Sequence, residues 1–251
     1  MAVNQRLRLR VYEWLERNLH RLLAPPCRLC GESPDATPEI CENCREALPW
    51  LGHACTMCGE SISDTAPRLC GRCLRQPPPW QQLVAPFAYT DPVAALIRGF
   101  KLEGDLAAGR VLADLLAQHL RASGVPLAPV LLPVPLHPRR LRARGFNQAT
   151  EIARRLPGTI RHRSLSRRTA GPHQRGHGIA ERRRNVRDAF HVETAVLPDH
   201  VALVDDVVTT GATAAAIATK LRRAGIARVD IYALAKTPRS QGPRARPKPP
   251  R

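Results

Sequence analysis

Residues 201–213, VALVDDVVTTGAT, constrain the fold more than any other segment of this 251-residue chain. An apolar run leads into two adjacent carboxylates, Asp205 and Asp206, and a helical pattern, AAAIATKLRRAG, begins directly after the segment. A loop of small or hydroxylated residues separates the two: Thr209, Thr210, Gly211, Ala212 and Thr213. Such a loop lets an anion approach the backbone, and the N–H groups and dipole at the start of the helix favour negative charge. The order predicts a strand, an acidic pair, a phosphate-binding loop and a helix.

A strand that ends in an acid is also found in P-loop NTPases, where the Asp helps to hold magnesium. That fold requires a glycine-rich loop closing in Gly-Lys-Ser or Gly-Lys-Thr. The nearest glycines, Gly104 and Gly109, are followed by Arg110 and Val111, so the pattern excludes a P-loop. A parallel strand that merely ends in polar residues is the remaining alternative.

The 201–213 segment resembles the phosphoribosyl pyrophosphate (PRPP) signature of type I phosphoribosyltransferases. The resemblance implies that Asp205 and Asp206 hold the ribose hydroxyls and that the loop from Thr209 to Thr213 holds the 5′-phosphate. It also implies Mg²⁺, bound together with PRPP, and transfer of a pentosyl group.

A wider pattern narrows the resemblance. Four Cys-x-x-Cys pairs come first, and PVPLHP at 133–138 leads into RGFNQ at 144–148. The pattern then continues at Gln174, Arg183, Asn185, Ala189 and Phe190. Over residues 25–238 the chain resembles the ComF family, that is, ComFC- and GntX-like proteins. This implies a role in DNA uptake or utilisation (competence), binding of single-stranded DNA, and partners in the DNA-uptake or helicase machinery.

All eight cysteines lie early in the chain, in four Cys-x-x-Cys pairs: Cys27, Cys30, Cys41, Cys44, Cys55, Cys58, Cys70 and Cys73. Two such pairs complete a tetrahedral Cys₄ site, which is closed and therefore structural, so two Zn²⁺ ions are expected. Sequential pairing, first with second and third with fourth, closes the shorter loops and is favoured; cross-braced pairing stays open. Disulfides would need an oxidising compartment, and iron–sulfur ligation is a minor alternative.

The fold class expected is α/β: a parallel-sheet type I phosphoribosyltransferase fold preceded by a small, Cys-rich double zinc ribbon. The expected domains are an amphipathic helix at 1–24, the zinc ribbons at 25–76, the phosphoribosyltransferase-like domain at 77–238 and a disordered basic tail at 239–251. Strands are expected at 83–89 (an edge strand, because it contains Pro86), 130–134, 201–204 and 229–234. Helices are expected at 91–99, 106–121, 147–156 and 212–224.

A second basic segment follows the strand at 130–134, so it should face the same crevice as the acids. We expect a loop at 136–148 in which Arg139, Arg140 and Arg144 bind pyrophosphate and Gly145 permits close approach. An exposed basic loop is the alternative. The resemblance places the family's catalytic loop at 167–190 and implies that Arg183 stabilises the departing pyrophosphate. Lys101 matches a family lysine that reaches the mouth of the site, and could equally be a surface lysine.

The charge is strongly unbalanced: 39 Lys and Arg against 21 Asp and Glu give +18, which favours a polyanionic partner such as nucleic acid. Neither a signal peptide nor a membrane-spanning run is recognisable, so a cytoplasmic protein is expected. The sequence shows no determinant for a nucleobase acceptor. A non-catalytic module that binds nucleic acid or senses the metabolite with the same fold is therefore the alternative function.

Overall fold

The computed structural model describes residues 26–32, 39–63, 68–167, 189–194 and 197–238. By its internal contacts the chain divides into two compact units, residues 1–48 and 49–251. The described part of the first unit carries four cysteines and a short helix, α2 (Glu42–Glu46). Within the described residues, no helix combines the length and apolarity needed to cross a bilayer.

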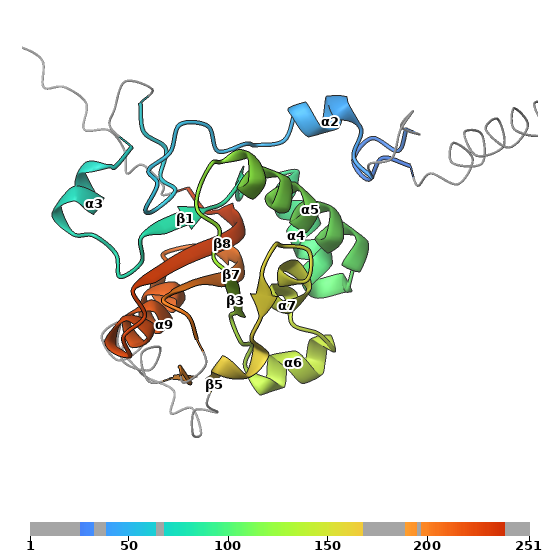
Figure 1. Ribbon diagram of the computed structural model, residues 1–251. Coiled ribbons are helices and arrows are strands. Elements are labelled where there is room, and N and C mark those ends of the chain that lie inside the picture. The colour runs from blue at the N-terminus through green and yellow to red at the C-terminus, as the bar shows by residue number, and fades with distance from the viewer. Residues whose placement is uncertain (1–25, 33–38, 64–67, 168–188, 195–196, 239–251) are drawn as a thin grey trace, which may run out of the picture. The chain divides into compact units, whose positions relative to one another are not determined.

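A six-stranded sheet in which every neighbouring pair is parallel forms the centre of the second unit (Figure 1). Its order is β1-β8-β7-β3-β4, and β2 extends the edge next to β8. The strands are β1 (Gln82–Val84), β2 (Phe87–Ala88), β3 (Val130–Pro133), β4 (Thr159–Ile160), β7 (His200–Val208) and β8 (Arg228–Lys236). An antiparallel pair, β5 (Leu165–Arg167) and β6 (Phe190–Val192), lies outside this sheet.

Helices cover both faces of the sheet (Figure 1). Leu203 and Ile231 share one core cluster with Ile217 and Leu221 of α9 (Ala212–Arg223), so alternate strand residues face that helix. On the other face lie α5 (Leu106–Ala122) and α7 (Gln148–Ala153), with α4 (Val93–Arg98) packed beside α5. Burial of both faces explains the nearly continuous apolar strands read from the sequence. The Cys-rich ribbon followed by a mostly parallel α/β domain confirms the expected fold class.

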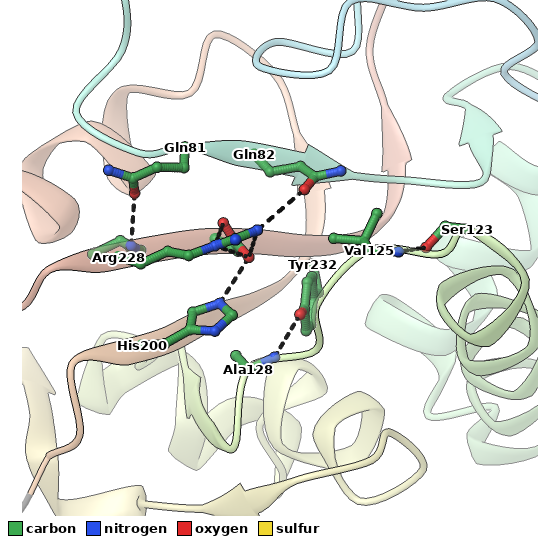
Figure 2. Close-up of polar contacts among 10 residues, drawn as sticks. Gln81, Gln82, Ser123, Val125, Ala128, His200, Arg228 and Tyr232 are labelled. Atoms are coloured by element: carbon green, nitrogen blue, oxygen red, sulfur yellow. Dashed lines mark hydrogen bonds and ion pairs between the residues drawn. The ribbon is translucent and has the colours of Figure 1, made fainter.

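The amino ends of the central strands are held by a buried carboxylate (Figure 2). Asp230 is fully buried; its Oδ2 lies 2.8 Å from His200 Nε2 and 3.0 Å from a terminal guanidinium nitrogen of Arg228. Gln82 of β1 accepts a hydrogen bond from the same guanidinium, and the Tyr232 hydroxyl accepts one from the backbone N–H of Ala128. The network therefore joins β1, β8 and β7 at the end of the sheet opposite the acid pair.

Several elements differ from the expectations. The strand expected at 83–89 is two strands interrupted at Ala85 and Pro86; its edge position is confirmed, because β1 and β2 pair with β8 alone among the described strands. The expected strand 201–204 continues through Asp205 and Asp206 to Val208, because β8 runs beside it as far as Lys236. The acids therefore lie within a strand rather than after one.

The segment expected as a loop at 136–148 contains a helix, α6 (Pro138–Arg144), which was missed. Pro138 stands at its start, where a proline costs no hydrogen bond, and the His137 side chain accepts from the N–H of Arg139 at 3.2 Å. Also missed were a π-helical turn, η1 (Gly99–Glu103), a short 3₁₀ turn, η2 (His162–Ser164), and strands β4, β5 and β6. The expected helix at 1–24 and tail at 239–251 lie outside the described residues, and the expected domain bounds remain predictions.

Candidate functional site

The acid pair and the α6 segment leave the sheet side by side. Pro133 of β3 is in register with Val204 of β7, and the N–H of Val134 donates to the carbonyl oxygen of Val204 at 2.9 Å. Asp205 follows Val204 directly, and α6 begins four residues after Val134. The carboxyl ends of neighbouring parallel strands therefore place both segments at one edge, which is where open α/β sheets bind ligands.

The carboxylates of Asp205 and Asp206 are held by the backbone and by one lysine. Oδ1 of Asp205 accepts from the N–H of Asp206 at 2.9 Å, and Oδ1 of Asp206 accepts from the N–H of Val207 at 2.6 Å. Nζ of Lys101 lies 2.9 Å from Oδ1 of Asp206, and both side chains are mostly buried. Burial, and then the neighbouring charge of Asp206, raise the pKa of Asp205 from 3.8 to about 7. Near neutral pH the Asp205 carboxyl group is therefore only partly ionised. A ligand that brings positive charge or hydroxyl donors would shift it toward the carboxylate.

Lys101 reaches the acid pair from a turn that the sequence did not predict. It lies in η1, where the preceding residue, Phe100, is fully buried. A Cβ on Gly109 of α5 would come within 2.4 Å of the Phe100 ring, so this helix position needs glycine for the ring to pack. The ring of Phe146 also contacts Phe100, at a centroid distance of 5.5 Å. The pair Phe100–Gly109 thus fixes η1 and directs Lys101 toward Asp206, which a hydrophobic pattern alone could not reveal.

The small-residue loop leads into α9 as expected. Gly211 has φ +77°, a left-handed conformation that favours glycine, and forms the N-cap of the helix. Thr209 and Thr210 are exposed, and the N–H of Ala212 donates to Oγ1 of Thr210 at 3.3 Å. A Cβ on Gly211 would lie 3.0 Å from Cη2 of Trp80, so the indole packs directly against the loop. The helix start, the exposed hydroxyls of Thr209 and Thr210 and the exposed Ala212 together give a loop that can receive a phosphate.

The arginines expected to bind pyrophosphate lie on α6 and at its end. Arg139 and Arg140 are exposed, Arg144 is half-buried, and Gly145 ends the helix at φ +78°. The Asn147 side chain donates to the carbonyl of Val134 at 3.1 Å, which ties the end of this segment back to the edge that carries the acids. A helix presents these guanidinium groups on a more rigid base than the expected loop would.

Arg167 adds a basic group that the sequence analysis did not single out. It ends β5 opposite Phe190 of β6, and its guanidinium lies over the Phe190 ring at 5.4 Å. Burial, and then the charge of Arg140, lower the pKa of Arg167, so the two guanidinium groups lie near enough to repel each other. Residues 168–188, which include Gln174, Arg183 and Asn185, lie outside the described residues, and the role of Arg183 stays a prediction.

The cysteines form two clusters in the sequential pairing. One contains Cys27, Cys30, Cys41 and Cys44; the other contains Cys55, Cys58, Cys70 and Cys73. In each, the ligand sulfurs lie within 4.8 Å of one another, and the Sγ–Sγ distances Cys30–Cys41 and Cys58–Cys70 are both 3.7 Å. A tetrahedral Zn²⁺ with Zn–S bonds of about 2.3 Å requires sulfurs about 3.8 Å apart. Backbone N–H groups also donate to Cys27 and Cys55, each at 3.3 Å. The geometry fits two structural zinc sites and excludes disulfides, in which sulfurs lie about 2.05 Å apart.

The second cysteine cluster is connected to the 209–213 loop through Trp80. The indole Nε1 donates to the carbonyl of Met57 at 2.7 Å, and the same ring packs on Gly211. The N–H of Leu83 in β1 donates to the carbonyl of Thr56 at 2.9 Å. The second ribbon, residues 55–75 with its helix α3 (Gly71–Arg75), therefore braces the sheet edge and the loop.

Comparison with known proteins agrees with this architecture. A family described as "Double zinc ribbon domain" matches residues 18–74. "DNA utilization protein YhgH" of Salmonella typhi is 37% identical over 207 residues, which cover 79% of this chain and 90% of the relative. The protein of that name in Escherichia coli K12 is 35% identical with the same coverage. "Competence protein F" of Haemophilus influenzae is 32% identical over 211 residues, 78% of this chain and 90% of the relative. On this coverage and identity, the chain belongs to the ComF family, the family of competence protein F and DNA utilization protein YhgH, and carries that family's double zinc ribbon.

Proposed function

We propose that this protein binds phosphoribosyl pyrophosphate with Mg²⁺ between β7 and α9 and acts in DNA uptake or utilisation as a phosphoribosyltransferase-type protein. The observation that carries the proposal is the acid pair, Asp205 and Asp206, placed on one strand directly before a loop with a left-handed Gly211 and an exposed pair of threonines. Carboxylates suit the hydroxyls of a ribose, and the loop suits its 5′-phosphate. A 5-phosphoribosyl group carries both.

The binding roles follow from the residues at the edge of the sheet. Asp205 and Asp206 accept hydrogen bonds from the ribose hydroxyls, while Lys101 keeps the charge of the pair balanced before the ligand arrives. The exposed Arg139 and Arg140 attract the pyrophosphate. Carboxylate oxygens are the donors that Mg²⁺ prefers, so the acid pair would meet a Mg²⁺ that enters with the pyrophosphate. Bound Mg²⁺ would supply charge neutralisation for a leaving pyrophosphate.

Electrostatics account for the transfer step that this site could support. Positive charge develops at the anomeric carbon as the bond to pyrophosphate breaks, and the fixed carboxylates of Asp205 and Asp206 favour it. The guanidinium groups of α6, and that of Arg183 by resemblance, favour the negative charge on the departing pyrophosphate. The protein contributes preorganised charge rather than a covalent intermediate.

The connection to DNA rests on charge and on the relatives. The chain carries a formal charge of +18, which suits a polyanion. The relatives are named for DNA utilization and competence, which favours single-stranded DNA and the DNA-uptake or helicase machinery as partners. The same names also suit a second function, a non-catalytic module that binds nucleic acid or senses PRPP with this fold.

Titration calorimetry with PRPP and Mg²⁺ tests the site. We expect binding by the wild type and loss of binding in the Asp205→Asn/Asp206→Asn double variant. A matched control, Glu193→Gln/Asp199→Asn, removes two exposed carboxylates and should bind as the wild type does. Equal affinity in both double variants would show that the acids do not hold the ligand.

Release of pyrophosphate, measured with a panel of nucleobases and DNA ends, separates the two functions. Release with any acceptor identifies transfer and names the acceptor class. PRPP binding without release from any acceptor supports the non-catalytic module.

A further inference from the structure

A cavity of about 290 Å³ lies between the second zinc ribbon and the phosphate loop. Its ribbon side is formed by α3 and the Pro77–Pro79 segment, and its other side by the start of α9 and the ends of β7 and β8. The lining residues that matter for its chemistry are Arg72, Gln76, Trp80, Thr210, Ala215 and Lys236. Among the described residues that line it, none is acidic, and neither Asp205 nor Asp206 is one of them. The cavity is therefore a neighbour of the proposed ribose site rather than part of it.

The lining combines an apolar wall with a few polar groups. Pro77–Pro79, Trp80 and Ala215 provide the apolar surface, while Arg72, Gln76 and Thr210 provide hydrogen-bond donors. Ligand pockets commonly have this composition, and the volume lies just below their usual range of about 300–1,000 Å³. A space of this size suits a group no larger than one nucleotide, which excludes a duplex.

The charge on α3 differs from that on its counterpart in the first ribbon. Each helix follows a zinc ligand, with the sequence CENCRE at 41–46 and CGRCLR at 70–75. In the first, Arg45 pairs with Glu42 at 3.5 Å. In the second, Arg72 and Arg75 are both exposed, and no described carboxylate pairs with either. Within the part of the ribbon that the structure describes, nothing neutralises these two arginines, so their charge is available to a ligand.

Loop and cavity share residues. Thr210, Gly211 and Ala212 belong to the loop and also line the cavity. A ligand that places one phosphate at the loop and continues as a chain therefore has a path toward Arg72. PRPP ends at its 5′-phosphate and cannot follow it, whereas a polynucleotide strand can.

We propose that this cavity binds one nucleotide of a single-stranded nucleic acid, with a phosphate near Arg72 and the sugar or base against the wall formed by Pro77–Pro79 and Trp80. The proposal rests on the proposed function, because it takes the 209–213 loop as the adjacent phosphate site. It assigns the second ribbon a direct part in binding the strand, in addition to bracing the fold.

The test measures binding of fluorescein-labelled dT15 and U15 by the full-length protein over a series of salt concentrations. Affinity for a single strand falls with salt, and each phosphate contact adds about 0.7 to the magnitude of the slope of log K against log salt. At 0.1 M salt, relative to 1 M, one such contact is worth about fivefold in affinity. We expect Arg72→Gln to weaken binding about fivefold at 0.1 M salt and to reduce the magnitude of the slope by about 0.7. The matched control, Arg223→Gln, removes an exposed arginine at the opposite end of α9 and should leave the slope unchanged. The two probes tell DNA from RNA.

A second variant guards against damage to the zinc site, because Arg72 lies between two ligands. Ala215→Phe fills the cavity without a change in charge, and we expect it to weaken binding of dT15 while zinc content stays at two per chain. If Arg72→Gln loses zinc, the effect of Ala215→Phe on dT15 binding tests the proposal on its own. The proposal is overturned if neither variant weakens binding more than Arg223→Gln does, or if the wild type binds neither probe. PRPP calorimetry on the same samples distinguishes failure of this proposal from failure of the proposed function. If the wild type does not bind PRPP, the proposed function is refuted.

Discussion

Nζ of Lys101 lies 2.9 Å from Oδ1 of Asp206, and this ion pair joins the η1 turn to the end of β7. Two acids adjacent in sequence repel each other, and the nearby ammonium group offsets part of that repulsion. The charge of Lys101 acts on Asp205 as well, where it lowers a pKa that burial and Asp206 raise. Lys101 therefore stabilises the ionised form of both carboxyl groups of the acid pair.

Replacement of Lys101 by Met should weaken PRPP binding at pH 7 by at least about tenfold, equivalent to about 1.4 kcal/mol. Without the ammonium group the acid pair takes up a proton more readily and loses acceptor capacity for the ribose hydroxyls. Calorimetry measures the change, and Arg98→Met, which removes an exposed cation three residues earlier, is the control. An affinity within twofold of the wild type would show that the ion pair does not serve the site.

The sequence could predict the order of the elements that form this site along the chain, but not the contacts between distant elements. The strand, acids, small loop and helix around residues 201–213 follow from local pattern alone, and so do the two Cys₄ sites. The place of Lys101 depends on Phe100 packing against Gly109, a contact between two elements that a pattern of apolar residues does not specify. Arg167 was overlooked for a similar reason, because it gains its position by pairing across two short strands.

Two predicted element boundaries were wrong: the end of the strand at 201–204 and the loop at 136–148. Carboxylates are poor strand residues, so the strand was expected to end at Val204; the neighbouring β8 extends it to Val208. The segment after Pro138 was expected to be a pyrophosphate-binding loop, although Pro138 at the first position and the His137 cap are both helix-start signals. These signals were present in the sequence and could have predicted α6.

Stability should depend on pH through Asp205. Its pKa in the folded protein is about 7, against 3.8 ordinarily, so the folded state holds a proton that the unfolded state loses between about pH 4 and 7. The free energy of unfolding therefore falls as pH rises across that window. In Asp205→Asn this contribution is missing, so the variant should gain stability relative to wild type between pH 4 and 8, by up to about 4 kcal/mol for three pKa units. Urea denaturation at several pH values measures it. A relative stability that stays flat, as expected for the exposed control Glu103→Gln, would contradict the assignment.

Loss of zinc from the second cluster should affect the 209–213 loop more than loss from the first. Met57, between two ligands of the second cluster, accepts the hydrogen bond of Trp80, and Trp80 packs on Gly211. Cys55→Ser should therefore weaken PRPP binding, whereas Cys27→Ser, the equivalent change in the first cluster, should weaken it less. Zinc content establishes that each variant has lost one ion. Equal effects on PRPP affinity would mean that Trp80 does not transmit the order of the ribbon to the loop.

The Asp230 network (Figure 2) should serve stability alone, since it lies at the amino ends of β7 and β8. The acid pair lies toward the carboxyl end of β7. Asp230→Ala removes the carboxylate that Arg228 and His200 both contact, and because both partners are partly exposed, the loss of these contacts should cost about 1–3 kcal/mol. Asp230→Asn keeps the shape and one acceptor oxygen, and should cost less. Urea denaturation ranks the three proteins, and PRPP affinity below the unfolding transition should be the same in all of them. An Asp230→Ala protein as stable as wild type would show that water replaces the carboxylate at the partly exposed Arg228 and His200, whereas a selective loss of PRPP affinity would connect the two ends of the sheet.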